Sequence, residues 1–255
     1  MSLVLAALSV SAGLRIVSLA PALTEDLFAI GAGPQVVGVD LSSNRPARAN
    51  ALPRVGGMSD VNTEAVLALH PDLVVGVPLE AAPLADLGRA GVRTASIPLD
   101  GLQDDLRAIE RLGVLTRRQA AAHRVTTALR SRLDRLAAGA RRTRRLSAFV
   151  WLGGMGAAGG GSFVDELLRL ANLRNVAGDV RSPWITFSAE QLLRAQPDVV
   201  VVPDPSAPLR GEPWDRLAAV NGGRIVRVPE DDLFRPGPRV AEVLADLIAG
   251  VRPWR

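Results

Sequence analysis

Residues 116–139 read TRRQAAAHRVTTALRSRLDRLAAG, and this stretch decides the expected fold. Thr116 and Gln119 have the spacing of a capping box, apolar residues recur at helical spacing around Leu129, and Gly139 is typical of a helix end. At about 1.5 Å per residue the pattern predicts one helix of roughly 36 Å. Most helices of compact domains are shorter than this.

Similar sequences flank this predicted helix on both sides. The sequence EAVLALHPDLVV begins at Glu64, and EQLLRAQPDVVV begins at Glu190. Glu, Leu, Pro, Asp and two Val residues fall at the same places, with an offset of 190 − 64 = 126 residues. A long helix between two similar halves predicts two lobes joined by a stiff element.

Short β-like runs alternate with helical ones in both halves. We expect strands at residues 15–19, 36–39, 73–77, 92–97, 146–152, 199–202 and 224–228. We expect helices at residues 24–30, 63–69, 84–90, 102–112, 163–171, 188–195, 214–220 and 240–251. We expect loops at residues 42–58, at the glycine-rich residues 153–161 and around Trp184.

This alternation predicts an α/β fold with two Rossmann-like lobes, mostly parallel sheets, and one long rigid helix that joins the lobes. The expected parts are a signal-like segment or its remnant (1–12), an N-terminal lobe (13–112), the helix (113–140) and a C-terminal lobe (141–255). Residues 2–12 are apolar and end in a small-x-small sequence, which favours a secretory signal; an N-terminal strand is the alternative.

Composition excludes several kinds of site. Without cysteine, the sequence given has no disulfide, thiolate metal site, cysteine nucleophile or lipid-modified cysteine. Tyrosine is also missing, there are two histidines, and all 30 basic residues are arginine. No G-x-S-x-G motif occurs, and neither histidine has metal-ligand spacing, so we expect no catalytic residues, no metal and no resident cofactor.

Two motifs support rival functions. Gly154, Gly156 and Gly159 spell G-x-G-x-x-G, with Asp179 twenty residues further on, as in a dinucleotide-dependent oxidoreductase. Residues 173–179 lack the apolar run that the second strand of such a site needs, so a loop rimming a cleft is favoured. The run RRTRR at residues 141–145 suits a nucleic-acid partner or a solvated turn; the missing interleaved aromatics favour the turn.

Scarce aromatic residues lie near predicted strand ends. Trp151, Trp184, Phe234 and Met58 would line a pocket for a large, partly apolar ligand or would pack in the core. Three arginines near the same ends would meet ligand carboxylates: Arg45, Arg235 and Arg239.

Glu64 and Glu190 each stand in the first turn of a predicted helix. They complement the helix dipole there, or they form a separated pair of anions that docks onto arginines of a two-fold partner.

Several stretches, taken in order, resemble helical-backbone periplasmic binding proteins of ABC importers. They are IVSLAPALTE (16–25), LPRVGG (52–57), NTEAVLALHPDLV (62–74), GSFVDELL (161–168) and FRPGPR (234–239). The resemblance runs from about residue 14 to residue 247. It implies two α/β lobes on one rigid helix, limited closure, and a cobalamin, ferric siderophore or haem as ligand. It also implies that Glu64 and Glu190 engage a membrane permease dimer.

Within that family, NRPA at residues 44–47 and Pro183-Trp184 favour the cobalamin branch. Arg45 stands where that branch has tyrosine, which keeps a ferric siderophore as the alternative, and the lack of tyrosine places haem third. The resemblance implies a set of ligand contacts: Pro21, Arg45, Met58, Trp151, Trp184, Asp232, Phe234 and Arg235.

The expected protein is therefore a monomeric, non-catalytic periplasmic receptor. We expect it to be exported through a signal peptide, to lack a lipid anchor, and to deliver a corrinoid to an ABC permease.

Overall fold

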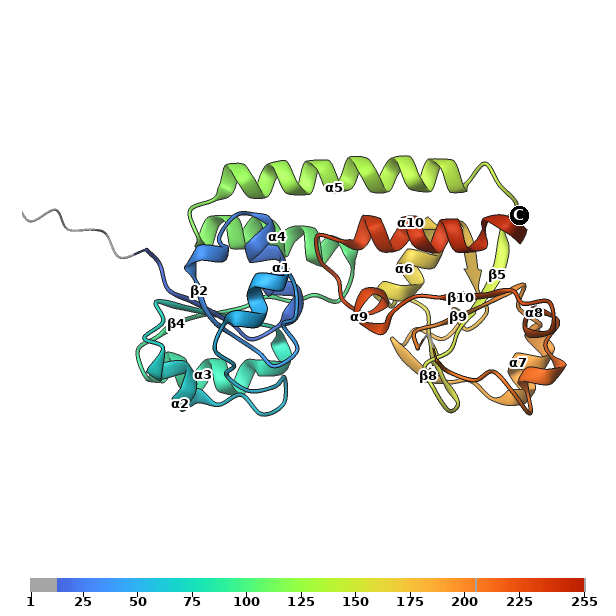
Figure 1. Ribbon diagram of the computed structural model, residues 1–255, viewed down its shortest axis with the longest axis horizontal. Coiled ribbons are helices and arrows are strands. Elements are labelled where there is room, and N and C mark those ends of the chain that lie inside the picture. Colours follow the sequence, from blue (N-terminus) through green and yellow to red (C-terminus); the bar gives the residue numbers. More distant parts are fainter. Residues whose placement is uncertain (1–12, 205, 255) are drawn as a thin grey trace, which may run out of the picture. The chain divides into compact units, whose positions relative to one another are not determined.

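The computed structural model describes residues 13–204 and 206–254, and the expected signal-like segment lies outside them. Contacts divide the chain into two compact units (Figure 1). Among the described residues, unit 1 comprises 13–24 and 31–97, and unit 2 comprises 25–30, 98–204 and 206–254. The expected lobe boundaries at residues 112 and 140 stay predictions.

Unit 1 contains a four-stranded sheet in the order β2-β1-β3-β4, and every neighbouring pair is parallel. Its strands are β1 (Ile16–Ser18), β2 (Val36–Val39), β3 (Leu73–Gly76) and β4 (Arg93–Ser96). Its helices are α2 (Thr63–Ala68), α3 (Ala81–Arg89) and the 3-10 helices Gly33–Gln35, Ala47–Ala51 and Pro78–Glu80. Helix α1 (Pro21–Ala29) starts in unit 1 and continues into unit 2.

Unit 2 contains a second parallel sheet in the order β10-β9-β5-β7. Its strands are β5 (Leu146–Val150), β7 (Leu173–Asn175), β9 (Val199–Val202) and β10 (Ile225–Arg227). Its helices are α4 (Leu102–Leu115), α5 (Gln119–Ala140), α6 (Phe163–Leu170), α7 (Ala189–Ala195), α8 (Ala218–Asn221), α9 (Glu230–Leu233) and α10 (Val240–Val251), with 3-10 helices Trp214–Arg216 and Arg252–Trp254. Two parallel sheets confirm the predicted α/β fold class.

The repeated Pro-Asp sequence has the same structural role in both units. Ahead of β3, the Asp72 carboxylate accepts a hydrogen bond from the Arg15 backbone N–H at 2.7 Å. Ahead of β9, the Asp198 carboxylate accepts one from the Ser147 backbone N–H, also at 2.7 Å. Each aspartate thus ties the start of its strand to the neighbouring β1 or β5. The following β-branched runs are fully buried, as in strands covered on both faces.

Helix α5 differs from the predicted long helix at both ends. It begins at Gln119 rather than at Thr116, and Gly139 lies inside it. The capping-box prediction is wrong because the Thr116 hydroxyl donates to the Leu112 carbonyl at 2.7 Å, which places Thr116 at the end of α4. The 22 residues of α5 correspond to about 33 Å.

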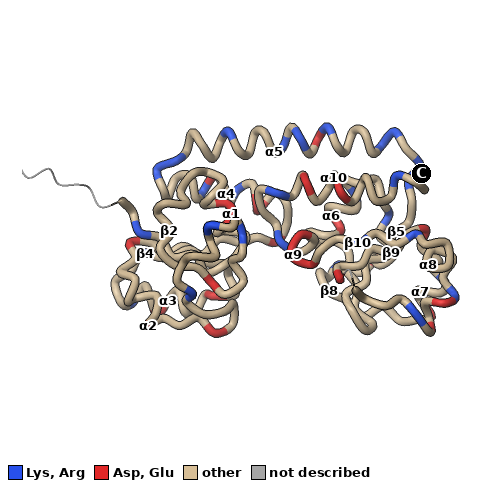
Figure 2. Tube along the Cα trace, viewed as in Figure 1, with Lys and Arg blue, Asp and Glu red and all other residues tan. Residues whose placement is uncertain are grey.

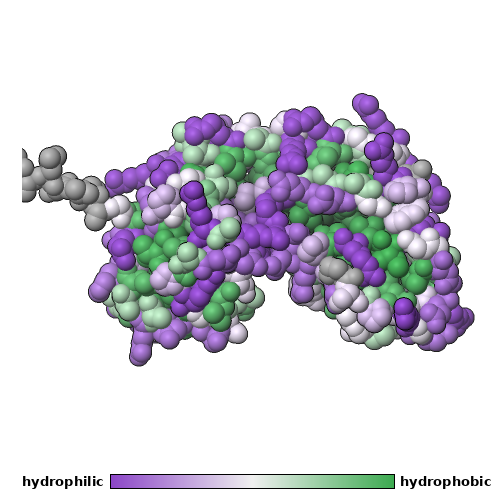
Figure 3. All heavy atoms as spheres, viewed as in Figure 1, coloured by the Kyte–Doolittle hydropathy of each residue, from purple (hydrophilic) through white to green (hydrophobic). Residues whose placement is uncertain are grey.

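Helix α5 buries one narrow stripe, which is flanked by a few half-buried residues, and exposes most of the others. Within unit 2 it packs against α4, α6 and α10 (Figure 1). The buried positions are Ala122, Thr126, Leu129, Leu133, Ala137 and Ala140. The segment 117–145 holds ten arginines and one aspartate, and Figure 2 shows blue recurring along α5. Figure 3 shows hydrophilic side chains at intervals along the same helix.

Two short strands appear where loops were predicted, and a third short strand, β7, was not predicted. β6 (Gly156–Ala158) pairs antiparallel with β8 (Trp184–Thr186), so residues 153–161 and Trp184 are not wholly loop. β7 pairs with β5, although residues 173–179 were expected to form no strand. None of the helices formed by the described residues is long and apolar enough to cross a membrane.

Candidate ligand-binding site

The carboxyl ends of three parallel strands meet at one edge of unit 2. Trp151 follows β5, Asp204 comes two residues after β9, and Glu230 comes three residues after β10. Ligands of open parallel sheets bind at such an edge. A pocket of about 440 Å³ opens there. It is lined by Trp151, Leu152, Gly153, Trp184, Val202, Pro203, Asp204, Ala207, Glu230 and Phe234.

Trp151 is held in place by contacts inside unit 2. Its indole N–H donates to the Gly154 carbonyl at 2.9 Å. Its ring lies edge-on to the buried Trp214, with 4.8 Å between ring centroids. The Trp151 ring therefore forms a preorganised apolar wall of the pocket.

Trp184 and Phe234 form a second wall. Their ring centroids lie 5.3 Å apart, and Trp184 remains 60% exposed. Both rings also line a neighbouring pocket of about 210 Å³ beside Ser162 and Pro236. An exposed indole backed by a second ring offers a stacking surface to a flat or bulky guest.

The charged side chains that line the larger pocket are acidic. The Asp204 carboxylate accepts hydrogen bonds from the Ser206 hydroxyl and from the Ser206 backbone N–H, both at 2.7 Å. These two bonds hold the pKa of Asp204 below its ordinary value, so the group stays ionised. Glu230 is the first residue of α9 and is exposed.

Two arginines expected to meet ligand carboxylates have partners inside unit 2. Arg235 donates to Glu25 at 3.1 Å and to Asp231 at 2.8 Å, and its side chain is only 8% exposed. Arg239 donates to Glu25 and Asp232, both at 2.6 Å.

The larger pocket is lined neither by these two arginines nor by their partners Glu25, Asp231 and Asp232. The roles of Asp232 and Arg235 as ligand contacts stay predictions.

Two further carboxyl groups are buried beside Glu25. Asp26 and Asp105 are both 0% exposed, and neither Asp26 oxygen has a hydrogen-bond partner among the described residues. Burial, together with the charges of Asp105 and Glu25, raises the pKa of Asp26 well above its ordinary value. Burial also raises the pKa of Asp105, to about 7. The pair therefore retains protons in the folded protein.

Unit 1 holds the other expected contacts. Pro21 is the first residue of α1, Arg45 lies half-buried in the loop after β2, and Met58 is 52% exposed. No pocket described for unit 2 includes them. Their roles stay predictions.

The strand ends of unit 1 also gather buried polar groups. Thr24 shares a 2.8 Å hydrogen bond with Ser43, and the Ser43 hydroxyl donates to Asp40. Glu80 is 0% exposed and accepts from the Val77 backbone N–H at 2.5 Å. Burial raises the pKa of Glu80 to about 7 despite that bond. These polar contacts fix the loops that follow β2 and β3.

Glu64 and Glu190 occupy matching positions in their units. Each lies in the first turn of a short helix whose N-cap side chain accepts a backbone hydrogen bond: Asn62 from Ala65 at 2.9 Å, and Ser188 from Gln191 at 3.1 Å. Both glutamates are exposed.

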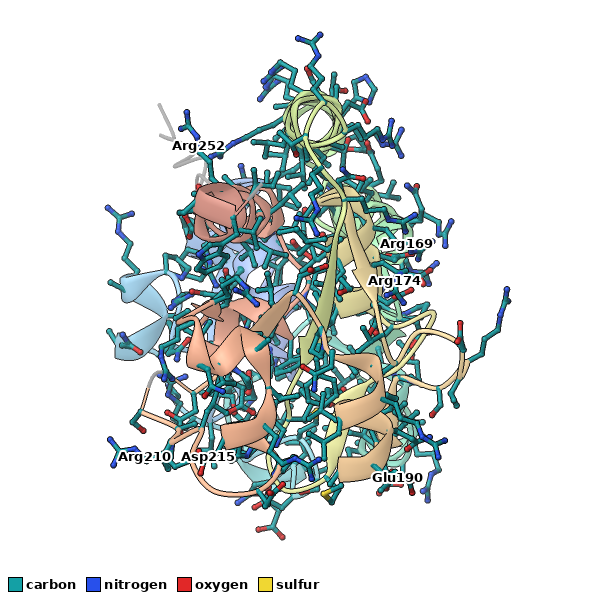
Figure 4. All side chains as sticks on the ribbon, turned by 90° about the vertical axis from the view of Figure 1, so that its right-hand side faces the viewer. Arg169, Arg174, Glu190, Arg210, Asp215 and Arg252 are labelled. Carbon is teal, nitrogen blue, oxygen red and sulfur yellow. The ribbon has the colours of Figure 1, made fainter. Side chains whose placement is uncertain are left out.

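Glu190 also pairs with Arg194 at 2.7 Å on the helix surface. In Figure 4, Glu190 lies at the end of unit 2 opposite α5. Ser188 already caps α7, so Glu190 is not needed as the cap of this helix.

The glycine-rich stretch does not form a phosphate-binding turn. Gly156 belongs to β6, and α6 starts only at Phe163, capped by the Ser162 side chain. An added Cβ at Gly159 would lie 2.2 Å from the Ser182 carbonyl, so this glycine permits close backbone packing. The described residues contain no group of three or more His, Asp or Glu suited to a metal ion. The structure therefore does not support the alternative of a dinucleotide-dependent oxidoreductase that uses this stretch.

Sequence reasoning missed the two pocket carboxylates. Asp204 follows directly on the Val-Val-Val-Val-Pro sequence of β9, a position where α/β proteins place ligand contacts, so the signal was present. Glu230 was harder to find, because its position depends on the turn that leads from β10 into α9.

Comparison with known proteins gives a family match over most of the chain. The family described as periplasmic binding protein matches residues 16–231. An uncharacterized ABC transporter substrate-binding lipoprotein, YvrC of Bacillus subtilis (strain 168), is 27% identical over 253 residues, which cover 94% of this chain and 80% of the relative.

Solved structures agree with that match. The periplasmic vitamin B12 binding protein BtuF of Vibrio cholerae superposes with a TM-score of 0.82 at 27% identity, covering 94% of this chain and 96% of the other. The periplasmic heme-binding protein RhuT from Roseiflexus sp. RS-1 gives a TM-score of 0.82 at 28% identity, covering 93% and 97%.

Proposed function

Because this chain belongs to the periplasmic binding protein family, we propose that it is the ligand-capturing receptor of an ABC importer and that its ligand is a corrinoid. It would bind the ligand without chemical conversion and deliver it to a membrane permease. The BtuF and YvrC similarities support the transport role, and both of these proteins are named for binding rather than catalysis.

The observation that carries this proposal is the aromatic pocket of unit 2. Trp151, Trp184 and Phe234, three of the predicted contacts, line one cavity at the carboxyl ends of the strands. Such a pocket suits a bulky ligand that buries apolar surface against the aromatic side chains. A corrinoid, with a broad macrocycle and uncharged amide side chains, fits this description.

A haem or a ferric siderophore is the second candidate. The similarity to RhuT, at the same identity level as BtuF, favours haem as the rival ligand. Its flat ring would use the same stacking surface on Trp184.

Calorimetric titration with cyanocobalamin, hydroxamate- and catecholate-iron complexes, haemin and NADH tests the proposal. We expect micromolar or tighter binding of cyanocobalamin and no binding of NADH. Binding of NADH alone would overturn the transport role, and tightest binding of haemin or an iron chelate would replace the corrinoid while keeping that role.

We further propose that Glu64 and Glu190 dock onto the permease. Their exposure, their separately capped helices and their matching places in the repeat support this role. Charge-assisted hydrogen bonds to arginines of the partner would provide the contact.

A further inference from the structure

The larger pocket of unit 2 has an unbalanced charge. Asp204 and Glu230 line it, and no arginine appears among the described residues that do so. In a chain with a net charge of +4 and 30 arginines, an acidic lining is not what composition alone predicts. The acidic lining acts on the part of a ligand that contacts unit 2.

Three arginines near this edge do not line the pocket. Arg227 donates to the backbone carbonyls of Asp204 and Ala207 at 3.1 and 3.4 Å, and its charge helps to lower the pKa of Asp204, but it does not line the pocket. Arg235 is bound to Glu25 and Asp231. Arg210, on the same loop as Asp204, points outward from unit 2 in Figure 4.

The Asp204 charge is also fixed. Both Ser206 hydrogen bonds favour the ionised carboxylate and lower its pKa, so the group does not neutralise itself to admit an anion. An anionic group entering the pocket would face two exposed carboxylates, and their repulsion would be strongest at low ionic strength.

We propose that unit 2 selects its ligand by charge: the pocket formed by Trp151, Trp184 and Phe234 accepts uncharged or cationic ring systems, and Asp204 and Glu230 reject acidic ones. This inference rests on the proposed function and narrows it. It favours an uncharged or cationic corrinoid over ligands that would bring carboxylates to this pocket, such as a porphyrin dicarboxylate or a polycarboxylate siderophore. Asp204 and Glu230 are thus specificity residues of the site.

Two fluorescent probes of nearly the same shape test the charge rule without assuming the native ligand. Phenylnaphthylamine is uncharged, and anilinonaphthalene sulfonate carries the same rings with one negative charge. We expect the wild-type protein to bind the uncharged probe at least tenfold more tightly at low ionic strength. Repulsion by one carboxylate near a surface amounts to roughly fivefold in affinity.

Substitutions then assign the effect to the two carboxylates. Asp204→Asn with Glu230→Gln keeps the side-chain shape and should bring the two probe affinities within about threefold of each other. Asp246→Asn, an exposed change on α10 outside the pocket, should leave the wild-type ratio. Trp184→Ala should weaken both probes together, which places them in this pocket.

Three results would overturn the inference: equal binding of both probes by the wild type, an unchanged ratio in the double variant, or probe binding that survives Trp184→Ala. The titrations with metal chelates remain a separate readout. If no chelate binds but the probe ratio behaves as stated, the proposed function fails and the charge rule stands. If a chelate binds but the double variant keeps the probe ratio of the wild type, the charge rule fails and the proposed function stands.

Discussion

The buried carboxyl groups of unit 2 affect the stability of the folded protein. Asp26 and Asp105 lie within one desolvated cluster with Glu25, whose charge is neutralised by Arg235 and Arg239. Removing Glu25 would leave two partly or fully buried guanidinium groups without their shared partner, a loss that typically costs about 3–5 kcal/mol. The Glu25 ion pairs therefore hold the second half of α1 within unit 2.

Asp105 should make stability depend on pH. Its pKa is raised from 3.8 to about 7 by burial, so the folded protein keeps a proton that the unfolded chain releases. The free energy of unfolding should therefore fall as pH rises from about 4 to 7, by at most about 4 kcal/mol from this group. Glu80, whose pKa is also about 7, adds a fall of the same sign in unit 1.

Urea denaturation of wild type and Asp105→Asn from pH 4 to pH 8 measures this effect. The asparagine should flatten the profile in part, since Asp26 and Glu80 remain, and exposed Asp246→Asn should leave it unchanged. Parallel profiles for wild type and Asp105→Asn would contradict the buried-proton account.

At the scale of elements, the α4–α5 contact depends on one glycine. A Cβ at Gly113 of α4 would lie 2.5 Å from the Cβ of Ala122 on α5. Alanine is normally better than glycine inside a helix by about 1 kcal/mol. Here the clash should reverse the sign, and Gly113→Ala should destabilise unit 2 by about 1–3 kcal/mol.

Gly139→Ala is the matched control for this prediction. Gly139 lies in α5, and an added Cβ there would meet nothing within 4 Å, so alanine should stabilise by about 0.5–1 kcal/mol. Thermal melts of the two variants should shift in opposite directions. A stabilising Gly113→Ala would show that α4 and α5 do not approach so closely.

The repeat shows how far the sequence could predict these elements. Its Pro-Asp sequences, capped helices and β-branched strands all recur in the structure 126 residues apart, and His70 and Gln196 share left-handed φ values of 46° and 37°. The strand β7 was missed because Leu173–Asn175 is too short to show periodicity and is stabilised by pairing with β5. The end of α4 was missed because Thr116 suits either end of a helix.

The candidate site was predictable in its aromatic residues but less so in its charges. Trp151, Trp184 and Phe234 are rare residues close to strand ends, so their place in the chain was informative. Arg235 looked equally suitable, yet its partner Glu25 lies 210 residues away in sequence. No local sequence pattern predicts an ion pair between residues so far apart in sequence. This ion pair determines which charged side chains remain in the pocket.

At the scale of the whole molecule, the proposed role requires a contact with the permease that is separate from ligand capture. Glu64→Ala combined with Glu190→Ala should abolish the ligand-dependent stimulation of permease ATP hydrolysis and leave ligand affinity unchanged. Neither glutamate lines the pockets of unit 2. Stimulation that survives both substitutions would reduce these residues to partners of the helix dipole.

Titration of cyanocobalamin into wild type, Trp184→Ala and Val180→Ala tests the central claim most directly. Val180 is an exposed apolar residue that lines neither pocket, whereas Trp184 lines both. We predict micromolar or tighter binding by wild type and Val180→Ala, and a loss of roughly tenfold or more in Trp184→Ala. Equal affinities for all three proteins, or no binding to the wild type, would contradict capture of a corrinoid at this aromatic pocket.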